Sequence, residues 1–376
     1  VVLRVRPPHE EELRVDGTAD ERGAPRYACV SVLRPSVVAL HSEEPAVGGA
    51  PTGRLATSCS ALHRAFGADD SDEGVFSELE PQIHEALFGH GVGGCSAVHI
   101  IAYGPTGAGK THTSRLLAER LLPRLLEASA PPREAAPPEG RGAVELGMLE
   151  VLGERCFDLL AGHAEVHARD DGTGSVQLQG LSRVVTAEPE ELLAALRQGF
   201  AVRRTSATEA NARSSRSHAV CELRMAGGGA LLRIVDLAGS ERAREVMGHS
   251  AERMQEAKDV NWSLSCLRDC VRCAARGAAR SSGRPSPAPP FRRTRLTLLL
   301  REAFRPGARC IWLAHAAPTS RHLAATRATL RCAEDLLAMD ARRPAAARGA
   351  AAWSRAQLQR WLRGLESGRL AHVAEA

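Results

Sequence analysis

The sequence contains few aromatic side chains and almost no lysine. Phe, Trp and Tyr make up 3% of the 376 residues, and the 49 Lys and Arg residues include only two lysines, Lys110 and Lys258. So few aromatics give little support to stacking of single-stranded nucleic-acid bases. No apolar run reaches the length of a membrane span, and no signal peptide opens the chain. The composition therefore argues against a membrane-spanning protein and against a single-strand binder.

The ten cysteines follow no regular spacing. Cys270 and Cys273 form a C-x-x-C pair with Cys266 one helical turn earlier, but no second pair or nearby histidine completes a zinc site. Buried thiols on a helix are the simpler interpretation, and zinc is the alternative. The length allows one large domain or two, and 44% hydrophobic residues support a sizeable core. We expect a reduced, intracellular, soluble α/β protein that forms a segment of a longer chain.

The most informative stretch is a phosphate-binding signature. Residues 104–111 read GPTGAGKT and match G-x-x-x-x-G-K-[ST]. A buried strand is expected before it, over Ala97–Tyr103, and a helix after it, over Thr113–Leu122, ending at the proline that follows. Lys110 is expected to reach the β- and γ-phosphates, and the Thr111 hydroxyl to ligate Mg²⁺. A chance glycine turn is the alternative. Against it, nearly all basic residues of this chain are arginines, and yet one of its two lysines occupies this position.

Two polar segments lie further along the chain. Residues 211–218 read NARSSRSH and precede an apolar-alternating strand; an ordinary Ser/Arg-rich turn is the alternative interpretation. In the second segment, residues 231–241, a hydrophobic strand ends in Asp236 and Gly239 follows. Asp236 can hold Mg²⁺ through water, and the Gly239 N–H can sense a γ-phosphate. A strand that ends in Asp is common, so the order of all three elements favours a nucleotidase.

A basic stretch extends from Cys270 to Arg301, where eight arginines and no acidic residue occur. It is interpreted either as a solvated basic loop or as an electrostatic footprint for an acidic polymer.

Hydrophobic periodicity predicts the remaining elements. Strands are expected over Val1–Arg6, Cys29–Leu33, Val37–Leu40, Ala219–Met225, Leu231–Asp236 and Cys310–Ala316, with a strand and a turn over Val144–Leu160. Helices are expected over Val75–Leu87, Glu188–Phe200, Glu256–Arg276 and Ala325–Met339, and an exposed loop over Ser129–Gly142.

Together these motifs resemble a kinesin motor domain. Arg4–Pro7 (RVRP) resembles the family's first-strand motif under the adenine, and Ala102–Thr113 (AYGPTGAGKTHT) resembles its phosphate loop in a chromokinesin-like form. Thr208-x-x-Asn211 with SSRSH resembles switch I, and DLAGSE, residues 236–241, resembles switch II. Residues 261–264 resemble the relay helix, and residues 290–297 resemble the tubulin-contacting loop and helix.

The resemblance implies an α/β fold of the kinesin-type P-loop NTPase class, with a central mixed β-sheet flanked by helices on both faces. It implies a motor domain over residues 1–340 that hydrolyses ATP with Mg²⁺ and moves on microtubules. Residues 341–376 are expected to be a linker and an amphipathic helical segment, interpreted as a neck helix or as the start of a sterile alpha motif domain. No heptad run predicts a dimerising coiled coil, so any oligomerisation is expected outside this segment.

The resemblance also assigns roles to individual residues. Ser215 would close on the metal and the γ-phosphate, and Arg216 would pair with Glu241 around the attacking water. The expected catalytic residues are Ser215, Arg216, Gly239 and Glu241, and the expected metal ligands are Thr111, Ser215 and Asp236. The expected nucleotide-binding residues are Arg4, Pro7, Gly104, Pro105, Thr106, Gly107, Ala108, Gly109, Lys110, Thr111, His112, Asn211 and Ser214. The expected microtubule-binding residues are Arg280, Arg284, Arg292, Arg293 and Arg295.

Several departures from the family pattern bear on activity. The loop between Thr113 and Pro123 is shorter than usual, Trp262 stands where Lys is usual, and Arg268 replaces the usual Gly. These departures argue for the alternative of a catalytically weak, kinesin-like microtubule-binding scaffold, and the intact switch motifs argue against it. A third interpretation, a P-loop ATPase acting on nucleic acid, leaves the SSRSH and DLAGSE pair unexplained. The expected location is the cytoplasm and the microtubule cytoskeleton, with the spindle as one site.

Overall fold

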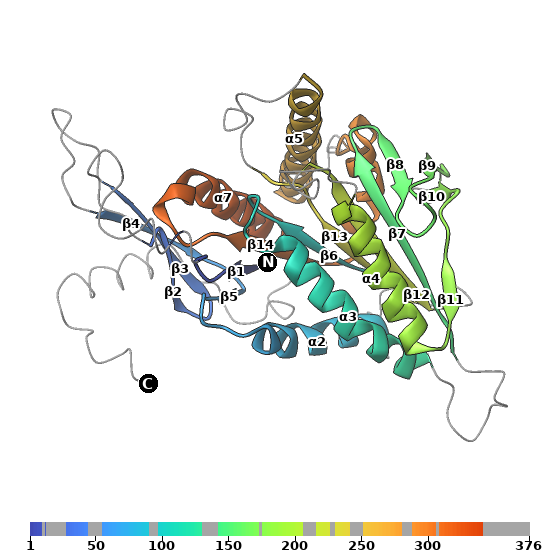
Figure 1. Cartoon of the computed structure of the whole chain (residues 1–376). Helices are drawn as coiled ribbons and strands as arrows, with labels where there is room; N and C mark the ends of the chain where they lie inside the picture. The colour runs from blue at the N-terminus through green and yellow to red at the C-terminus, as the bar shows by residue number, and fades with distance from the viewer. Residues whose placement is uncertain are drawn as a thin grey trace.

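A mixed β-sheet forms the centre of the molecule (Figure 1). This computed structural model describes residues 1–9, 12, 28–43, 55–89, 97–129, 142–172, 175–205, 216–225, 230–240, 251–279, 288–305 and 308–340. In spatial order the strands are β10 (Val176–Gln179), β9 (Glu165–Asp170), β8 (Arg155–Asp158), β7 (Val144–Leu152), β12 (His218–Met225), β13 (Leu231–Asp236), β6 (Ala97–Tyr103), β14 (Arg309–Ala316), β1 (Val2–Val5) and β5 (Arg64–Phe66), and β11 (Val184–Thr186) pairs with β7.

The sheet is parallel in one half and antiparallel in the other. Strands β13, β6, β14, β1 and β5 pair in parallel, whereas β12, β7, β8, β9 and β10 pair in antiparallel fashion. All residues of β13 and nearly all of β6 are buried. A strand covered on both faces reads as a continuous hydrophobic run, and this is why the sequence predicts both strands well.

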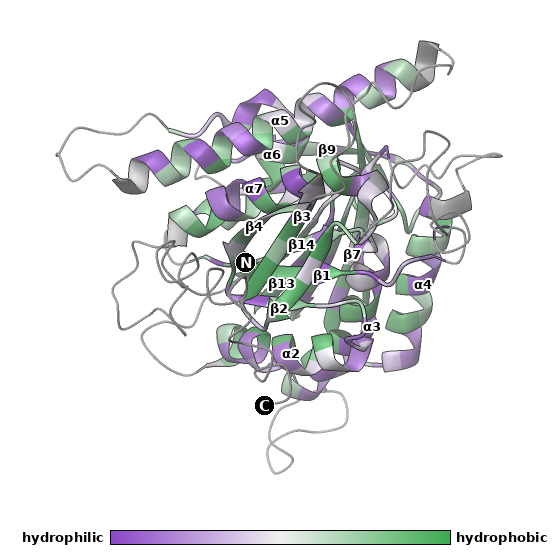
Figure 2. Cartoon of the chain, turned by 90° about the vertical axis from the view of Figure 1, so that its left-hand side faces the viewer, coloured by the Kyte–Doolittle hydropathy of each residue, from purple (hydrophilic) through white to green (hydrophobic). Residues whose placement is uncertain are grey.

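Helices cover both faces of the sheet (Figure 1). One layer contains α2 (Asp72–Phe88), α3 (Lys110–Ser129) and α4 (Pro189–Thr205), and the other contains α5 (Ala251–Ala279), α6 (Arg295–Leu299) and α7 (Leu323–Asp340). Val98 and Ile100 of β6 pack toward the first layer, and Ile101 and Tyr103 pack toward the second. Figure 2 shows largely hydrophobic strands between helices that carry polar residues. Short 3₁₀ turns are η4 (Phe291–Arg293), η5 (Arg301–Phe304) and η6 (Ser320–His322).

A second, three-stranded sheet lies beside the N-terminal strand. It contains β2 (Val30–Arg34), β3 (Val37–Glu43) and β4 (Leu55–Ala61) in antiparallel order. Val38 and Leu40 of β3 share a core with Leu3 of β1 and Leu330 of α7. Within the described ranges, no helix is long and apolar enough to cross a membrane.

The expected fold class is confirmed, and the predicted strands and helices are present with small shifts at their ends. One boundary was wrong, because α3 does not stop before Pro123 but continues to Ser129. Proline removes one N–H donor from the helix. Leu121, Leu122 and Leu125 are buried on both sides of it, so packing of the two flanking turns offsets the lost hydrogen bond.

Some strands were not predicted, and some predicted segments are not described by the structure. The periodicity did not predict β9, β10 or β11, which are short strands of three to six residues with exposed positions. Most of the expected loop over Ser129–Gly142 and the whole C-terminal segment, residues 341–376, lie outside the described residues. The domain boundary at residue 340 therefore stays a prediction.

Candidate functional site

The candidate functional site lies where parallel strands end at one edge of the sheet. β6 leads into the glycine loop of residues 104–109, β13 ends at Asp236, and β1 leads into Arg6. The carboxyl ends of parallel strands meet at the same edge, which is where open α/β sheets bind their ligands. Backbone hydrogen bonds confirm the proximity, because the N–H of Ser240 donates to the carbonyl of Gly104 at 3.1 Å.

The glycine loop has a backbone that only glycine adopts easily. Gly104, Gly107 and Gly109 all have positive φ angles of 152°, 74° and 93°. At Gly104 an added Cβ would collide with the carbonyl oxygen of His315, so β14 also excludes a side chain there. Helix α3 begins at Lys110, directly after the loop. The loop and the positive end of this helix together form a concave anion-binding backbone.

Lys110 lies within this loop rather than on the surface. Its side chain is buried, and Nζ donates to the carbonyls of Gly104 and Pro105 at 2.9 and 2.8 Å. These contacts hold the ammonium group against the loop backbone. A compact cation on a flexible stem suits this place, whereas the planar fork of an arginine needs more room.

Thr111 and Asp236 meet although they are far apart in the sequence. The Thr111 hydroxyl donates to Oδ2 of Asp236 at 2.5 Å. The same oxygen is ion-paired with Arg203, which is 1% exposed and donates through Nη2 to the carbonyl of Ser217 at 2.8 Å. One carboxylate therefore connects the phosphate loop, the end of β13 and the end of α4.

The oxygen atoms at this junction fit a magnesium ion. Asp236 Oδ1 is buried and, within the described part of the chain, has no hydrogen-bond partner. A carboxylate oxygen and a threonine hydroxyl are the hard oxygen donors that Mg²⁺ prefers. The expected ligands Thr111 and Asp236 are thus together, while Ser215 lies outside the described residues.

A second set of polar contacts surrounds the first turn of α3, directly after the glycine loop. Arg4 donates to Oγ1 of Thr113 at 2.9 Å and is ion-paired with Asp72, which also contacts Nε2 of His112 at 2.8 Å. His315 Nε2 lies 3.0 Å from the same Thr113 hydroxyl. Burial and the nearby Lys110 charge lower the pKa of His315 to about 3, so His315 is neutral.

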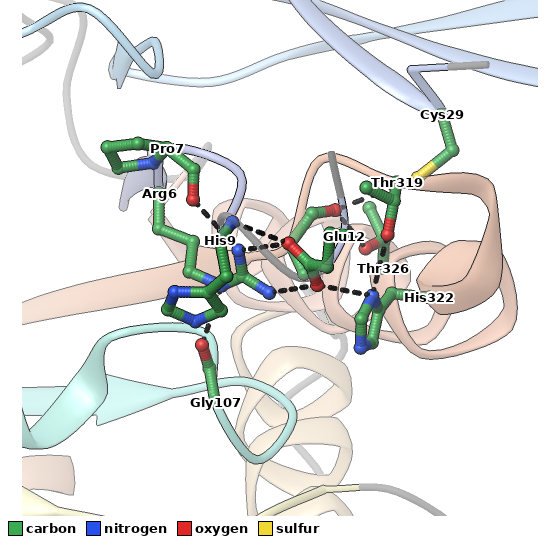
Figure 3. Close-up of polar contacts among 10 residues, drawn as sticks. Arg6, Pro7, His9, Glu12, Cys29, Gly107, Thr319, His322 and Thr326 are labelled. Carbon is green, nitrogen blue, oxygen red and sulfur yellow. Dashed lines mark hydrogen bonds and ion pairs between the residues drawn. The ribbon is translucent and has the colours of Figure 1, made fainter. Parts of the chain in front are cut away.

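Arg6 and Glu12 form a clamp on the open side of the loop (Figure 3). The Arg6 guanidinium binds both carboxylate oxygens of Glu12 at 2.6 and 2.7 Å, and Arg6 Nε donates to the carbonyl of Gly107 at 2.6 Å. The N–H of His9 donates to Glu12 at 2.9 Å, and His322 approaches Glu12 at 3.6 Å. The hydrogen bonds from Arg6 hold the pKa of Glu12 at about 2. The clamp ties the end of β1 to the phosphate loop.

We expect Glu12→Gln to destabilise the protein at neutral pH, with the difference from wild type vanishing in acid. The folded-state pKa of about 2 lies below the ordinary value of 4.5. Ionised Glu12 therefore stabilises the fold fully above about pH 4.5, and this contribution is lost as the pH falls toward 2. Urea unfolding of both proteins between pH 7 and about pH 2, the folded-state pKa, measures the difference.

Glu127→Gln is the control, because Glu127 is an exposed helix carboxylate paired only with Arg124 in the described part of the chain. Its effect should be small at every pH. A Glu12→Gln difference that stays constant with pH would show that the carboxylate charge is not what the clamp uses.

Some of the other predicted nucleotide-binding and catalytic residues lie outside the described residues, and the rest are described. Asn211, Ser214, Ser215 and Glu241 lie outside the described residues. Arg216 is described, and it donates to Glu256 of α5 at 3.1 Å. Its expected pairing with Glu241 stays a prediction. Gly239 is buried beside the loop, and Pro7 supplies its carbonyl to Arg6 at 2.8 Å. Thr106 is exposed at the tip of the loop, and Pro105 and Ala108 are buried in it.

The predicted microtubule-binding arginines lie partly on one surface beside α5. Arg292 is 77% exposed and pairs with Asp170, and Arg293 pairs with Asp269 of α5 at 3.1 Å. Arg295 instead donates to the carbonyls of Glu154, between β7 and β8, and Ala168 of β9, so it joins α6 to the edge of the sheet. Arg280 and Arg284 lie outside the described residues. Cys266 and Cys270 are buried on α5 as predicted, whereas Cys273 is only half-buried. Among the described residues no group of His, Cys, Asp and Glu could hold a metal ion.

Sequence reasoning missed three residues of this site. Arg203 looked like an ordinary cation at a helix end, and nothing in its spacing pointed to a carboxylate 33 residues away. Glu12 lies in an acidic run, Glu10–Glu12, that gave no sign of a buried pair. Arg6 did have a signal, because it directly follows β1 and lies two residues after Arg4 in the RVRP motif, and alternate residues of an extended chain point to the same side.

Comparison with known proteins places the chain among motor domains. A family model described as the kinesin motor domain matches residues 4–338. Kinesin-like protein KIFC2 of Homo sapiens is 35% identical over 311 residues, which cover 75% of this chain and 34% of that protein. Diatom spindle kinesin-1 of Cylindrotheca fusiformis is 30% identical over 303 residues, covering 78% and 45%.

One long match and one solved structure extend the comparison. Kinesin-like protein KIF18B of Mus musculus is 31% identical over 361 residues, covering 89% of this chain and 40% of that protein. A solved structure of a fast kinesin matches with a TM-score of 0.69 at 23% identity, covering 89% of this chain and 90% of the other, which supports the fold. The chain spans less than half the length of each of these three relatives.

Proposed function

Because the chain belongs to the kinesin motor domain family, we propose that it hydrolyses ATP and couples hydrolysis to binding and movement on microtubules. The observation that carries this proposal is the junction of Thr111 with Asp236 beside the glycine loop. A phosphate loop needs a metal-holding carboxylate next to its Thr, and these residues are 125 positions apart. The location that follows is the microtubule cytoskeleton.

The described residues offer several of the groups that phosphoryl transfer requires. That reaction needs little covalent help and depends on positioning and charge neutralisation. Lys110 supplies a cation inside the loop, and the loop N–H groups orient the phosphates. Mg²⁺ held by Thr111 and Asp236 would neutralise charge on the phosphate oxygens. The Gly239 N–H follows Asp236 on the segment that is bound to Gly104 through Ser240.

One observation favours a catalytically weak microtubule-binding scaffold as the second candidate. Asp236 is already paired through Oδ2 with the buried Arg203, so the guanidinium charge opposes binding of a second cation at Oδ1. If the pairing persists with nucleotide bound, turnover is slow while the surface around α5 can still bind.

Steady-state ATPase activity of the full chain with and without microtubules tests the proposal. Several-fold stimulation by microtubules supports a motor. Low, unstimulated turnover together with co-pelleting supports the scaffold. Absence of both nucleotide and microtubule binding contradicts both candidates, and pelleting against DNA at the same salt concentration tests the nucleic-acid interpretation.

We expect Arg292→Ala/Arg293→Ala to weaken microtubule binding several-fold at low salt and by less at high salt. Both side chains are exposed near α5, and long-range attraction to an acidic polymer is screened by salt. Co-pelleting at two salt concentrations measures the change.

Arg124→Ala/Arg197→Ala is the charge-matched control, because Arg124 and Arg197 are 53% and 61% exposed but belong to α3 and α4, in the layer on the opposite face of the sheet. Equal weakening by both variants would mean that net charge, and not this surface, determines binding.

A further inference from the structure

Glu150 of β7 is a buried carboxylate that the chemistry described so far does not use. Its side chain is completely buried. Oε2 contacts Nε2 of His163 at 2.7 Å, and the His163 ring stacks on Phe157 with ring centroids 4.4 Å apart. In the part of the chain that the structure describes, Oε1 has no hydrogen-bond partner. A buried carboxylate oxygen without a partner costs free energy, so its presence calls for an explanation.

The strand register places Glu150 in line with Asp236. Ala219 of β12 pairs with Asp236 on one side and with Glu150 on the other. Both carboxylates face the layer that contains α3 and α4, because Ile234 and Met148, two residues before each of them, belong to the core on that side. Two strand spacings put their Cα atoms about 10 Å apart. The small side chain of Ala219 leaves room between them.

Helix α4 carries Arg203 to the level of this row. An added Cβ at Gly199 would lie only 2.5 Å from Sδ of Met148, so the α4 backbone rests directly on β7. Arg203 follows Gly199 by about one helical turn, and Glu150 follows Met148 by two strand residues, which are advances of about 6 and 7 Å. Arg203 therefore comes level with Glu150 if α4 and β7 run in the same direction.

The contacts of Arg203 show that they do. Arg203 donates to the carbonyl of Ser217, which directly precedes β12, and pairs with Asp236 at the end of β13. Because β12 is antiparallel to β7, its first residues lie beside the last residues of β7. The buried guanidinium is thus at the same edge of the sheet as Glu150. One carboxylate lies on either side of the strand between them.

The charges of this row conflict once the metal site is filled. In this structure Arg203 neutralises Asp236 through Oδ2. With a divalent cation at Oδ1 and Thr111, Asp236 would face two cations at once, and repulsion between them is weakly screened in a buried site. Glu150 offers a second anionic oxygen on the same face. Arg203 can therefore leave Asp236 and still be paired with a carboxylate.

We propose that Glu150 is a positioning residue that receives Arg203 when Asp236 takes up the metal ion. The proposal rests on the proposed function only in taking Thr111 and Asp236 as a metal site. Arg203 exchanges Oδ2 of Asp236 for Oε1 of Glu150, while His163 holds the other carboxylate oxygen in place. The exchange removes the guanidinium from the metal site without leaving a buried charge unpaired.

The Mg²⁺ affinity of the ADP complex is the direct readout of this exchange. The full chain is loaded with a fluorescent ADP analogue and titrated in EDTA-buffered Mg²⁺, and release of the analogue reports loss of the metal. We expect Glu150→Gln to bind Mg²⁺ at least about tenfold more weakly, the effect of one charge-assisted hydrogen bond. The amide lacks the charge that compensates Arg203.

Two further variants control for charge and position. Glu150→Asp keeps the negative charge on a shorter side chain and should recover part of the lost Mg²⁺ affinity. Glu145→Gln removes a half-buried carboxylate from the same strand, but at a position that faces the opposite side of the sheet. It should match wild type. Equal weakening by Glu145→Gln and Glu150→Gln would overturn the proposal.

A double-variant cycle separates the exchange from a structural role. In the Arg203→Met background no guanidinium opposes the metal, so Glu150→Gln should leave Mg²⁺ affinity unchanged. If Glu150 only supports the β7–β8 hairpin through His163, Glu150→Gln lowers the melting temperature and changes Mg²⁺ affinity equally in both backgrounds. That result would overturn the proposal.

A crystal structure of the wild-type chain with Mg²⁺ and ADP tests the exchange without any substitution. Arg203 within hydrogen-bond distance of Glu150 Oε1 supports the proposal. An Arg203–Asp236 pair that persists with the metal bound overturns it.

Microtubule-stimulated ATPase activity distinguishes this proposal from the motor function. A Mg²⁺ affinity that depends on Glu150, in a chain whose turnover microtubules do not stimulate, supports the exchange and contradicts the motor function. Equal Mg²⁺ affinity in wild type and Glu150→Gln, with normal stimulation, overturns the exchange and leaves the motor function standing. A wild-type chain that binds no Mg²⁺ with nucleotide contradicts both.

Discussion

Replacement of Lys110 by Ala is expected to lower ATP turnover by about 10²–10³-fold, the usual effect of removing one preorganised charge from a transition state. The Nζ atom is buried in the glycine loop and is held by two loop carbonyls, so the substitution removes the cation from inside the loop. Steady-state ATPase assays and the affinity for a fluorescent ATP analogue, both without microtubules, measure the loss.

Two variants make this result specific. Lys110→Arg keeps the charge but replaces a point cation by a wider planar group, and we expect it to be defective as well. Lys258→Ala removes the second lysine, which is exposed on α5, and should leave turnover without microtubules near the wild-type value. Turnover in Lys110→Ala above a tenth of the wild-type rate would contradict the role of the glycine loop in catalysis.

The sequence predicted the parts of the site that are encoded locally. The glycine loop, β6 and β13 are contiguous, and their hydrophobic runs and glycine spacing leave few alternatives. The Thr111–Asp236 junction was also predictable, because parallel strands bring their carboxyl ends to one edge. Local sequence patterns specify the course of the backbone, and the side chains at the ends of the strands are placed by that course.

Contacts between distant side chains were not predictable in the same way. Arg203 and Glu12 have partners that depend on how helices and loops pack, and a sequence in which nearly all cations are Arg gives no reason to single out Arg203. Pro123 is a related case, where a local rule for ending a helix was overruled by leucines that are buried on either side. Burial in the folded protein therefore determines both the partners of these distant side chains and the end of α3.

Replacement of Asp236 by Ala is expected to have the largest effect on stability, about 3–5 kcal/mol, because it leaves the Arg203 charge buried without its carboxylate. Arg203 is 1% exposed, so solvent cannot replace the lost partner. Urea unfolding in the absence of nucleotide measures this loss. Thr111→Ala, which removes a hydrogen bond to the same oxygen but no charge, should cost only about 0.5–1.5 kcal/mol.

The double variant Arg203→Met/Asp236→Leu separates the charge from the fold. It removes both buried charges and keeps apolar volume, so it should recover most of the stability that Asp236→Ala loses. It should not recover Mg²⁺-dependent nucleotide affinity, because the carboxylate beside Thr111 is absent. Recovery of both properties would mean that Asp236 is structural only. Recovery of stability alone follows from the geometry, in which one carboxylate holds Arg203 and Thr111 through Oδ2 and keeps Oδ1 for a metal.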